Sequence, residues 1–240
     1  MVIHRYFLLC LVGVSCGWWG CQASSVDFER IMVDNGIYWR GEYGSDDLCS
    51  LSTNVSYASA MDFKFEPLTH MDNTGGNSVK LFCKDLGNHI TKYITSIEGQ
   101  AGTWQGVRSC PSSDFIVGFR LRVFPDQGAW GDDFAVDNIQ VECSDGTVLD
   151  GLNGVLPTRR HRQEQDGEEV SRERVELDGE RTVEVVRSSR GHREAKLNGN
   201  WGSWAECSAG KRVIGIQTIV EEHHPFEDDA GLCDVTMLCM

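Results

Sequence analysis

The sequence predicts an all-β protein assembled from three similar units of about forty residues each. Segment 118–125 places apolar residues at alternate positions with arginines between them, which is the period of a strand with one buried face. Segments 60–67 and 215–222 match it in length and position. The chain also has 26 glycines spread among short strand-like runs, and few long helical periodicities are present.

Each unit opens with an aromatic residue six positions before a cysteine and closes with a second cysteine. The opening aromatic residues are Tyr43, Trp104 and Trp201. The cysteines are Cys49 and Cys83, Cys110 and Cys143, and Cys207 and Cys239, separated by 34, 33 and 32 residues. Near-equal spacing beside matching strands favours a threefold internal repeat over coincidence, with units at about 35–83, 103–143 and 200–239.

Residues 1–23 have the pattern of a secretory signal peptide. Met1 to Arg5 is positively charged, 6–14 is almost wholly apolar, and small residues precede a cleavage point after Ala23. A membrane anchor needs about 20 unbroken apolar residues, which neither this segment nor any other provides. We therefore expect a secreted, extracellular protein without a membrane span, forming a single domain over 24–240.

Secretion favours disulfides, because extracellular compartments are oxidising. The repeat predicts the bridges Cys49–Cys83, Cys110–Cys143 and Cys207–Cys239. Each bridge could stabilise the fold by about 3–4 kcal/mol. Cys233 is left over, at the position that Asn77 and Asp137 hold in the other units. A buried thiol is the favoured interpretation, and pairing with Cys21 or with another chain is the alternative.

Charge and composition restrict the partners. The net charge of −14 argues against nucleic acid and fits a soluble secreted protein with a basic extracellular partner. Segment 157–196 carries charges of both signs without a cysteine or an aromatic residue, which predicts a solvated insert with a hairpin turn at Asp178-Gly179. Asn54-Val55-Ser56 is an N-glycosylation sequon, which we expect at the surface.

Several motifs together resemble a known family. They are Asn35-Gly36 before Trp39, Gly131-Asp132-Asp133 before Cys143, and Trp201-Gly202-Ser203-Trp204 before Cys207. This pattern is similar to the vitelline membrane outer layer protein 1 family over about 35–239, outside the insert. The resemblance implies a β-prism, in which three Greek-key sheets surround a pseudo-threefold axis with one repeat per sheet. It also implies an extracellular protein of egg vitelline-type coats, carbohydrate binding, and a transferase-like activity on chito-oligosaccharides.

Acidic turns recur at one point of each unit, eleven residues before the closing cysteine. They are Asp72-Asn73, Asp132-Asp133 and Asp228-Asp229. If Asp72, Asp132 and Asp228 converge on the axis, they form a candidate carbohydrate site, since carboxylates about 5–9.5 Å apart can perform glycosidic acid–base chemistry. The favoured alternative is turn structure, in which Asp and Asn side chains bond to nearby backbone amides.

Trp104 and Trp201 are further candidates for carbohydrate binding, by stacking on sugar rings at a prism edge. Core or edge packing is the favoured alternative for these indoles. His223-His224 has no third ligand nearby in the sequence, and no zinc spacing, Gly-x-Ser-x-Gly motif or phosphate loop is present. The sequence therefore predicts neither a metal nor a cofactor.

Three functions are open, in this order. The first is a structural or carbohydrate-binding component of an extracellular coat, and the second is a chito-oligosaccharide transferase or hydrolase that uses the axial acids. The third is a secreted module that binds a partner through the insert. No catalytic residue is identified and a non-enzyme is favoured, so glycans or extracellular matrix proteins are the expected partners.

Overall fold

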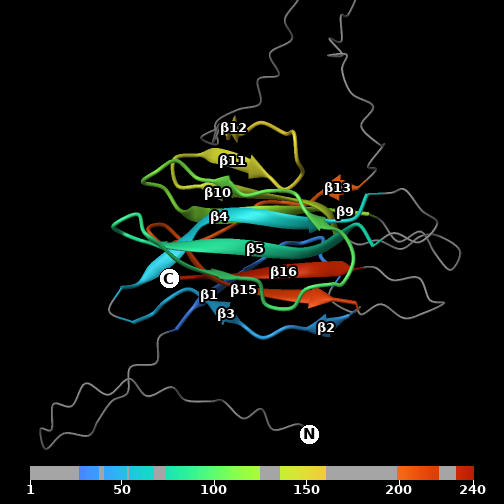
Figure 1. The fold of residues 1–240 in the computed structure, drawn as a ribbon, viewed down its shortest axis with the longest axis horizontal. Helices are drawn as coiled ribbons and strands as arrows, with labels where there is room; N and C mark the ends of the chain where they lie inside the picture. Colours follow the sequence, from blue (N-terminus) through green and yellow to red (C-terminus); the bar gives the residue numbers. More distant parts are fainter. Residues whose placement is uncertain are drawn as a thin grey trace, which may run out of the picture.

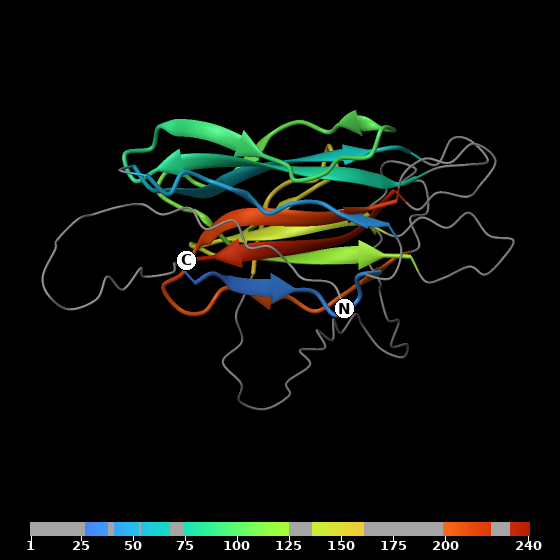
Figure 2. The ribbon, with the colours of Figure 1, turned by 90° about the horizontal axis from the view of Figure 1, so that it is seen from below.

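The computed structural model describes residues 27–37, 41–52, 54–67, 74–124, 136–160, 199–221 and 231–240. Over these residues the regular structure consists of sixteen β-strands in three sheets, which confirms the all-β prediction (Figures 1 and 2). Within the same ranges, no helix is long and apolar enough to cross a membrane. The predicted signal peptide, nearly all of the charged insert, Trp39, His223-His224 and the three acidic turns lie outside the described residues.

Sheet 1 is a Greek key near the middle of the chain. It contains β4 (Ser56–Phe65), β5 (Gly76–Asp85), β6 (Ile90–Ile94), β7 (Thr103–Trp104) and β8 (Arg108–Ser109). The first three strands pair in succession, and β7 and β8 return to the free side of β4. A fourth strand that returns beside the first defines the Greek key, and here that strand is divided into two short pieces.

Sheets 2 and 3 repeat this arrangement. Sheet 2 contains β9 (Ile116–Val123), β10 (Val136–Cys143), β11 (Thr147–Asp150), β12 (Thr158–Arg159), β13 (Asn200–Trp201) and β14 (Ala205–Glu206). Sheet 3 contains β1 (Glu29–Met32), β2 (Glu42–Tyr43), β3 (Asp47–Leu48), β15 (Val213–Val220) and β16 (Leu232–Cys239). In sheet 3 the first and last described strands pair, so blue β1 lies beside red β16 in Figure 1.

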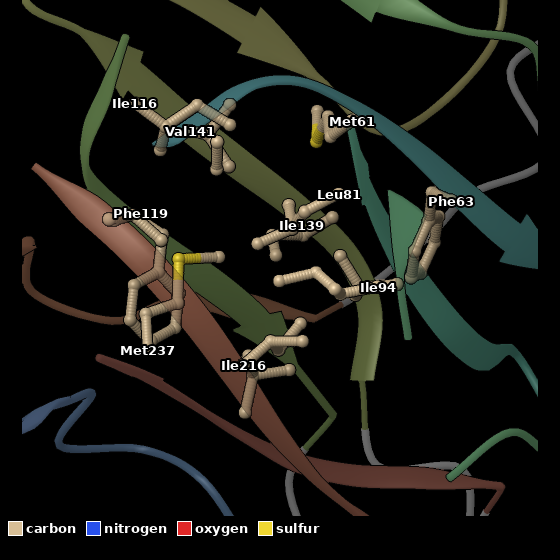
Figure 3. Close-up of a cluster of buried hydrophobic side chains, with 14 of the residues drawn as sticks. Met61, Phe63, Leu81, Ile94, Ile116, Phe119, Ile139, Val141, Ile216 and Met237 are labelled. Atoms are coloured by element: carbon tan, nitrogen blue, oxygen red, sulfur yellow. The ribbon is translucent and has the colours of Figure 1, made fainter. Parts of the chain in front are cut away.

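The three sheets share one hydrophobic core. The strand period of two sends Phe119, Leu121 and Val123 of β9 inward and leaves Arg120 and Arg122 outside it. Figure 3 shows core side chains from all three sheets facing one another, among them Met61, Leu81, Phe119, Ile139, Ile216 and Met237. All of these are fully buried. Burying each large apolar side chain contributes about 1.5–3 kcal/mol, so the β-prism is stabilised from three sides.

The sequence repeats and the sheets are out of step, so the prediction of one repeat per sheet is wrong. Each repeat gives its opening strands to one sheet and its hairpin to the next, because the opening strands pair with the hairpin that precedes them. The disulfides Cys49–Cys83, Cys110–Cys143 and Cys207–Cys239 are present as the repeat predicts. They therefore connect sheet 3 to sheet 1, sheet 1 to sheet 2, and sheet 2 to sheet 3.

Candidate functional site

The strands that follow the acidic turns begin together at one end of the prism. A side chain at Gly76 would come within 2.6 Å of the carbonyl oxygen of Val136, and one at Gly231 within 2.5 Å of the carbonyl oxygen of Gly76. The starts of β5, β10 and β16 thus meet backbone to backbone. Asp72, Asp132 and Asp228 lie a few residues upstream, outside the described residues, so their convergence stays a prediction.

A β-bulge follows at the same point of each sheet. The pairing register shifts there, and the extra residue is Asn77 in sheet 1, Asp137 in sheet 2 and Cys233 in sheet 3. Bulges re-aim side chains, and all three of these residues are buried. Cys233 lies outside the three disulfides, in agreement with the buried-thiol interpretation.

The chemistry at the bulges differs between the sheets. Asp137 accepts a hydrogen bond of 2.7 Å from Nε of Arg122, and burial raises the pKa of Asp137 more than Arg122 lowers it. The Asn77 amide donates to the Thr74 hydroxyl over 2.6 Å. The Cys233 thiol lies 3.6 Å from the carbonyl oxygen of Gly231.

The two candidate tryptophans lie on different sheets. Trp104 is on β7 of sheet 1, and the ammonium of Lys80 lies 3.8 Å from its ring centroid. Trp201 is on β13 of sheet 2, directly opposite Arg122 of β9. Both indoles are half-buried. The fold therefore places them at equivalent positions of two sheets and does not bring them together.

Trp201 belongs to a larger cluster, which we call the arginine–tryptophan face. Its members are Arg120, Arg122, Arg160, Trp201 and Trp204. The Arg120 guanidinium carbon lies 4.6 Å from the Trp201 centroid and 4.9 Å from that of Trp204. Arg122 lies 5.4 Å from Trp201, and Arg160 lies 4.6 Å from Trp204. Arginines and indoles therefore alternate across the outer face of sheet 2.

Hydrogen bonds hold the arginines of this face in place. Arg120 donates to Oε1 of Gln140 through Nε at 2.9 Å and Nη2 at 2.7 Å. Arg160 pairs with Glu142 at 2.6 Å and also with Glu206. Burial works against the charge of Arg160, but its bonds to Glu206 and Glu142 outweigh that effect and raise its pKa. Burial, followed by the like charge of Arg160, lowers the pKa of Arg120.

This geometry limits how a sugar could bind. A hexose stacked on Trp201 would compete with guanidinium groups that already lie over the ring, in cation–π contacts worth about 0.5–1 kcal/mol at exposed sites. The guanidiniums and the Gln140 amide can instead share hydrogen bonds with hydroxyl groups. Among the described residues, no group of three His, Cys, Asp or Glu side chains is placed to hold a metal ion.

The first and last residues of the predicted glycosylation sequon differ in solvent exposure. Asn54 is exposed, whereas Ser56 is fully buried. The Ser56 hydroxyl accepts a 3.0 Å hydrogen bond from the Ser50 amide, and it lies 3.0 Å from the Thr91 hydroxyl. A glycosyltransferase would therefore have to recognise Ser56 before this part of the chain folds. Glycosylation of Asn54 stays a prediction.

Three Greek-key sheets linked in a ring by three disulfides define the chain as a disulfide-linked β-prism protein. The sequence model of the vitelline membrane outer layer protein I family matches residues 29–171, more than half of the chain. The chain belongs to this family, as the sequence motifs predict.

Two proteins named vitelline membrane outer layer protein 1 homolog are similar to the chain. The one from Mus musculus is 28% identical over 241 residues, which cover 97% of this chain and 94% of that protein. The one from Homo sapiens is 32% identical over 126 residues, which cover 50% of this chain and 59% of that protein.

One solved structure aligns with most of the chain. It is a mannose-binding jacalin-related lectin from Ananas comosus, which aligns over 89% of this chain and 97% of its own, at 7% identity and a TM-score of 0.38.

Proposed function

We propose that this protein is a secreted structural component of an extracellular coat that binds glycans in the coat. The observation that carries this proposal is the closed ring of sheet-to-sheet disulfides. Membership of a family named after the vitelline membrane outer layer supports it.

The disulfide ring fits a protein that must persist outside cells. Disulfides are retained in oxidising compartments, and each bridge here restricts the unfolded chain, which stabilises the folded state by about 3–4 kcal/mol. Because each bond here joins two different sheets, a local opening of one sheet edge does not release that sheet from its neighbours. A coat protein that is not replaced after secretion benefits from such resistance to unfolding.

The proposal is tested by measuring first whether the protein is secreted and then whether the secreted protein binds glycans. The full chain, expressed in animal cells, should appear in the medium without residues 1–23. It should then bind isolated coat glycans or chito-oligosaccharides on a glycan array, and mass spectrometry of the bound oligosaccharide should show no change in its length. Retention inside the cell, or secretion without glycan binding, would contradict the proposal.

A second candidate is a glycan site or catalytic site formed by Asp72, Asp132 and Asp228. The observation that favours it is the meeting of β5, β10 and β16 at Gly76, Val136 and Gly231, just after the acidic turns. Charge-assisted hydrogen bonds contribute about 1.5–3 kcal/mol each, so Asp132→Asn should weaken sugar binding about ten- to a hundredfold at an unchanged melting temperature.

The turn interpretation makes the opposite prediction for the same residue. Asn is a good turn residue, so Asp132→Asn would be silent while Asp132→Ala would lower the melting temperature and leave affinity unchanged. Titration of both variants with a chito-oligosaccharide, beside their thermal melts, separates the two. Unchanged affinity in both variants removes the acidic site.

A further inference from the structure

The third repeat contains a tryptophan pattern that coat binding does not explain. Trp201 stands three residues before Trp204, and Trp204 stands three residues before Cys207. Trp-x-x-Trp and Trp-x-x-Cys are acceptor patterns for C-mannosylation, as Asn-x-Ser is for N-glycosylation. We propose that Trp201 is C-mannosylated, with a lipid-phosphate-linked mannose as donor. This inference rests on the secretion that the proposed function includes.

The chemistry is an electrophilic substitution on the indole. A carbon–carbon bond forms between C1 of the mannose and Cδ1 of Trp201, while the bond between C1 and the phosphate oxygen of the donor breaks. The Cδ1 proton is lost and the lipid phosphate leaves, so neither an oxidant nor a reductant is needed. The product is a neutral sugar held by a bond that hydrolysis does not cleave.

The folded structure can accommodate this addition. Trp201 lies on β13, which forms one edge of sheet 2, and its side chain is half-buried on the outer face. Beside it, Nη2 of Arg122 is buried and has no hydrogen-bond partner among the residues that the structure describes, and the Arg122 guanidinium carbon is 5.4 Å from the ring centroid. A hexose on this ring brings hydroxyl acceptors next to that donor.

The other repeats provide internal controls. Trp104 and Tyr43 occupy the equivalent position, but the residues three positions later are Val107 and Asp46. Trp104 is also half-buried, at the edge of its own sheet, with a cation over its ring. Trp104 therefore matches Trp201 in environment and differs in the acceptor pattern.

The experiment uses the full chain secreted by animal cells that also modify a co-expressed reporter peptide with the same Trp-x-x-Trp pattern. Peptide mass spectrometry should find one hexose on Trp201 that survives N-glycan release and β-elimination, and none on Trp104. Trp204→Ala should remove the hexose from Trp201. Val107→Trp, at a side chain that is 54% exposed, should add a hexose to Trp104 without disturbing the core.

The outcomes separate this inference from the proposed function. Chain in the medium with an unmodified Trp201, from cells that modify the reporter, overturns the inference and leaves the proposed function standing. Chain that never reaches the medium overturns both. If Trp201 still carries the hexose in the Trp204→Ala variant, the Trp-x-x-Trp pattern is not what directs the modification, and the inference is overturned.

Discussion

Sheets 2 and 3 have the same backbone arrangement at one β-bulge, but sheet 2 has an ion pair there and sheet 3 has an apolar pair. In sheet 2 the bulge residue Asp137 pairs with Arg122 of the neighbouring strand at 2.7 Å. In sheet 3 the corresponding residues are Cys233 and Ile219, which form a small apolar cluster with Ile37. Both pairs lie at the same register shift, between β9 and β10 in sheet 2 and between β15 and β16 in sheet 3.

The difference shows that the fold accepts different chemistry at this position, provided that the polar side chains placed there find partners. Sheet 1 is intermediate, because Lys64 donates to the carbonyl oxygen of Gly99 at 2.8 Å while Asn77 bonds to Thr74. Replacing a buried ion pair by apolar residues is often neutral, whereas removing one partner leaves an uncompensated charge. This comparison explains Cys233 as the apolar form of a position that is ionic in sheet 2.

The largest expected effect comes from breaking the ion pair. Asp137→Ala leaves the half-buried Arg122 without its carboxylate, and Arg122→Ile leaves the buried carboxylate of Asp137 without its guanidinium. Each should lower the free energy of unfolding by about 3–5 kcal/mol, measured by denaturant titration of the oxidised protein. The double variant Arg122→Ile/Asp137→Val, which imitates sheet 3, should recover most of that loss.

The double-mutant cycle tests whether the ion pair of sheet 2 can be exchanged for the apolar pair of sheet 3. Losses at independent sites add, whereas the losses expected here make the double variant much more stable than the sum of the two single losses would allow. If the two single losses simply add in the double variant, the sheets do not share an interchangeable pair. Ile219→Val in sheet 3 is the matched control, because it shortens the apolar partner without creating a charge, and should cost about 0.5–1.5 kcal/mol.

Much of the architecture could be predicted because its signals are local. Alternation in 118–123 marks a strand, and near-equal spacing pairs Cys110 with Cys143 without knowledge of the fold. Each of these signals lies within one repeat, so the period of the sequence is enough to find it.

Sheet membership and the arginine–tryptophan face could not be predicted in this way. β14 pairs with β9 across more than eighty residues of chain, and no local pattern records that partner. Arg160 lies near the start of the predicted insert and contacts Trp204, which lies beyond its end, so its role is visible only in the fold. The equivalence of Asn77, Asp137 and Cys233 was readable from spacing, but the bulge and the partner Ile219 required the pairing register.

A second prediction compares Asp234 with Asn138, the residues that follow the bulge in sheets 3 and 2. Oδ1 of each accepts the amide of the next residue, at 2.7 Å from Val235 and 2.8 Å from Ile139. Burial raises the pKa of Asp234 to about 6. The folded state therefore binds more protons than the unfolded state, and stability is lost as pH rises from about 4 to about 6.

Asp234→Asn should remove this loss, because the amide keeps the hydrogen bond and carries no charge. The gain in unfolding free energy should be near zero at pH 4 and about 2–3 kcal/mol at pH 7, since each pKa unit corresponds to about 1.36 kcal/mol. Thermal melts across this pH range measure it. Asn138→Asp is the reciprocal control and should introduce a loss of the same sign in sheet 2. A gain that does not vary with pH would contradict the ionisation argument.

The smallest effect concerns Cys233 itself. If the position is apolar, Cys233→Val should change the free energy of unfolding by less than about 1 kcal/mol, because it conserves volume and hydrophobicity. Cys233→Ser should cost about 1–2 kcal/mol, since a buried hydroxyl needs a partner. The shorter C–O bond also moves it further from the Gly231 carbonyl than the present 3.6 Å. Denaturant titration of both variants, with the disulfides intact, measures the difference. Equal stability of the Ser and Val variants would show that the thiol acts as a polar group, and sheet 3 would then resemble sheet 1 more closely than its apolar partner Ile219 indicates.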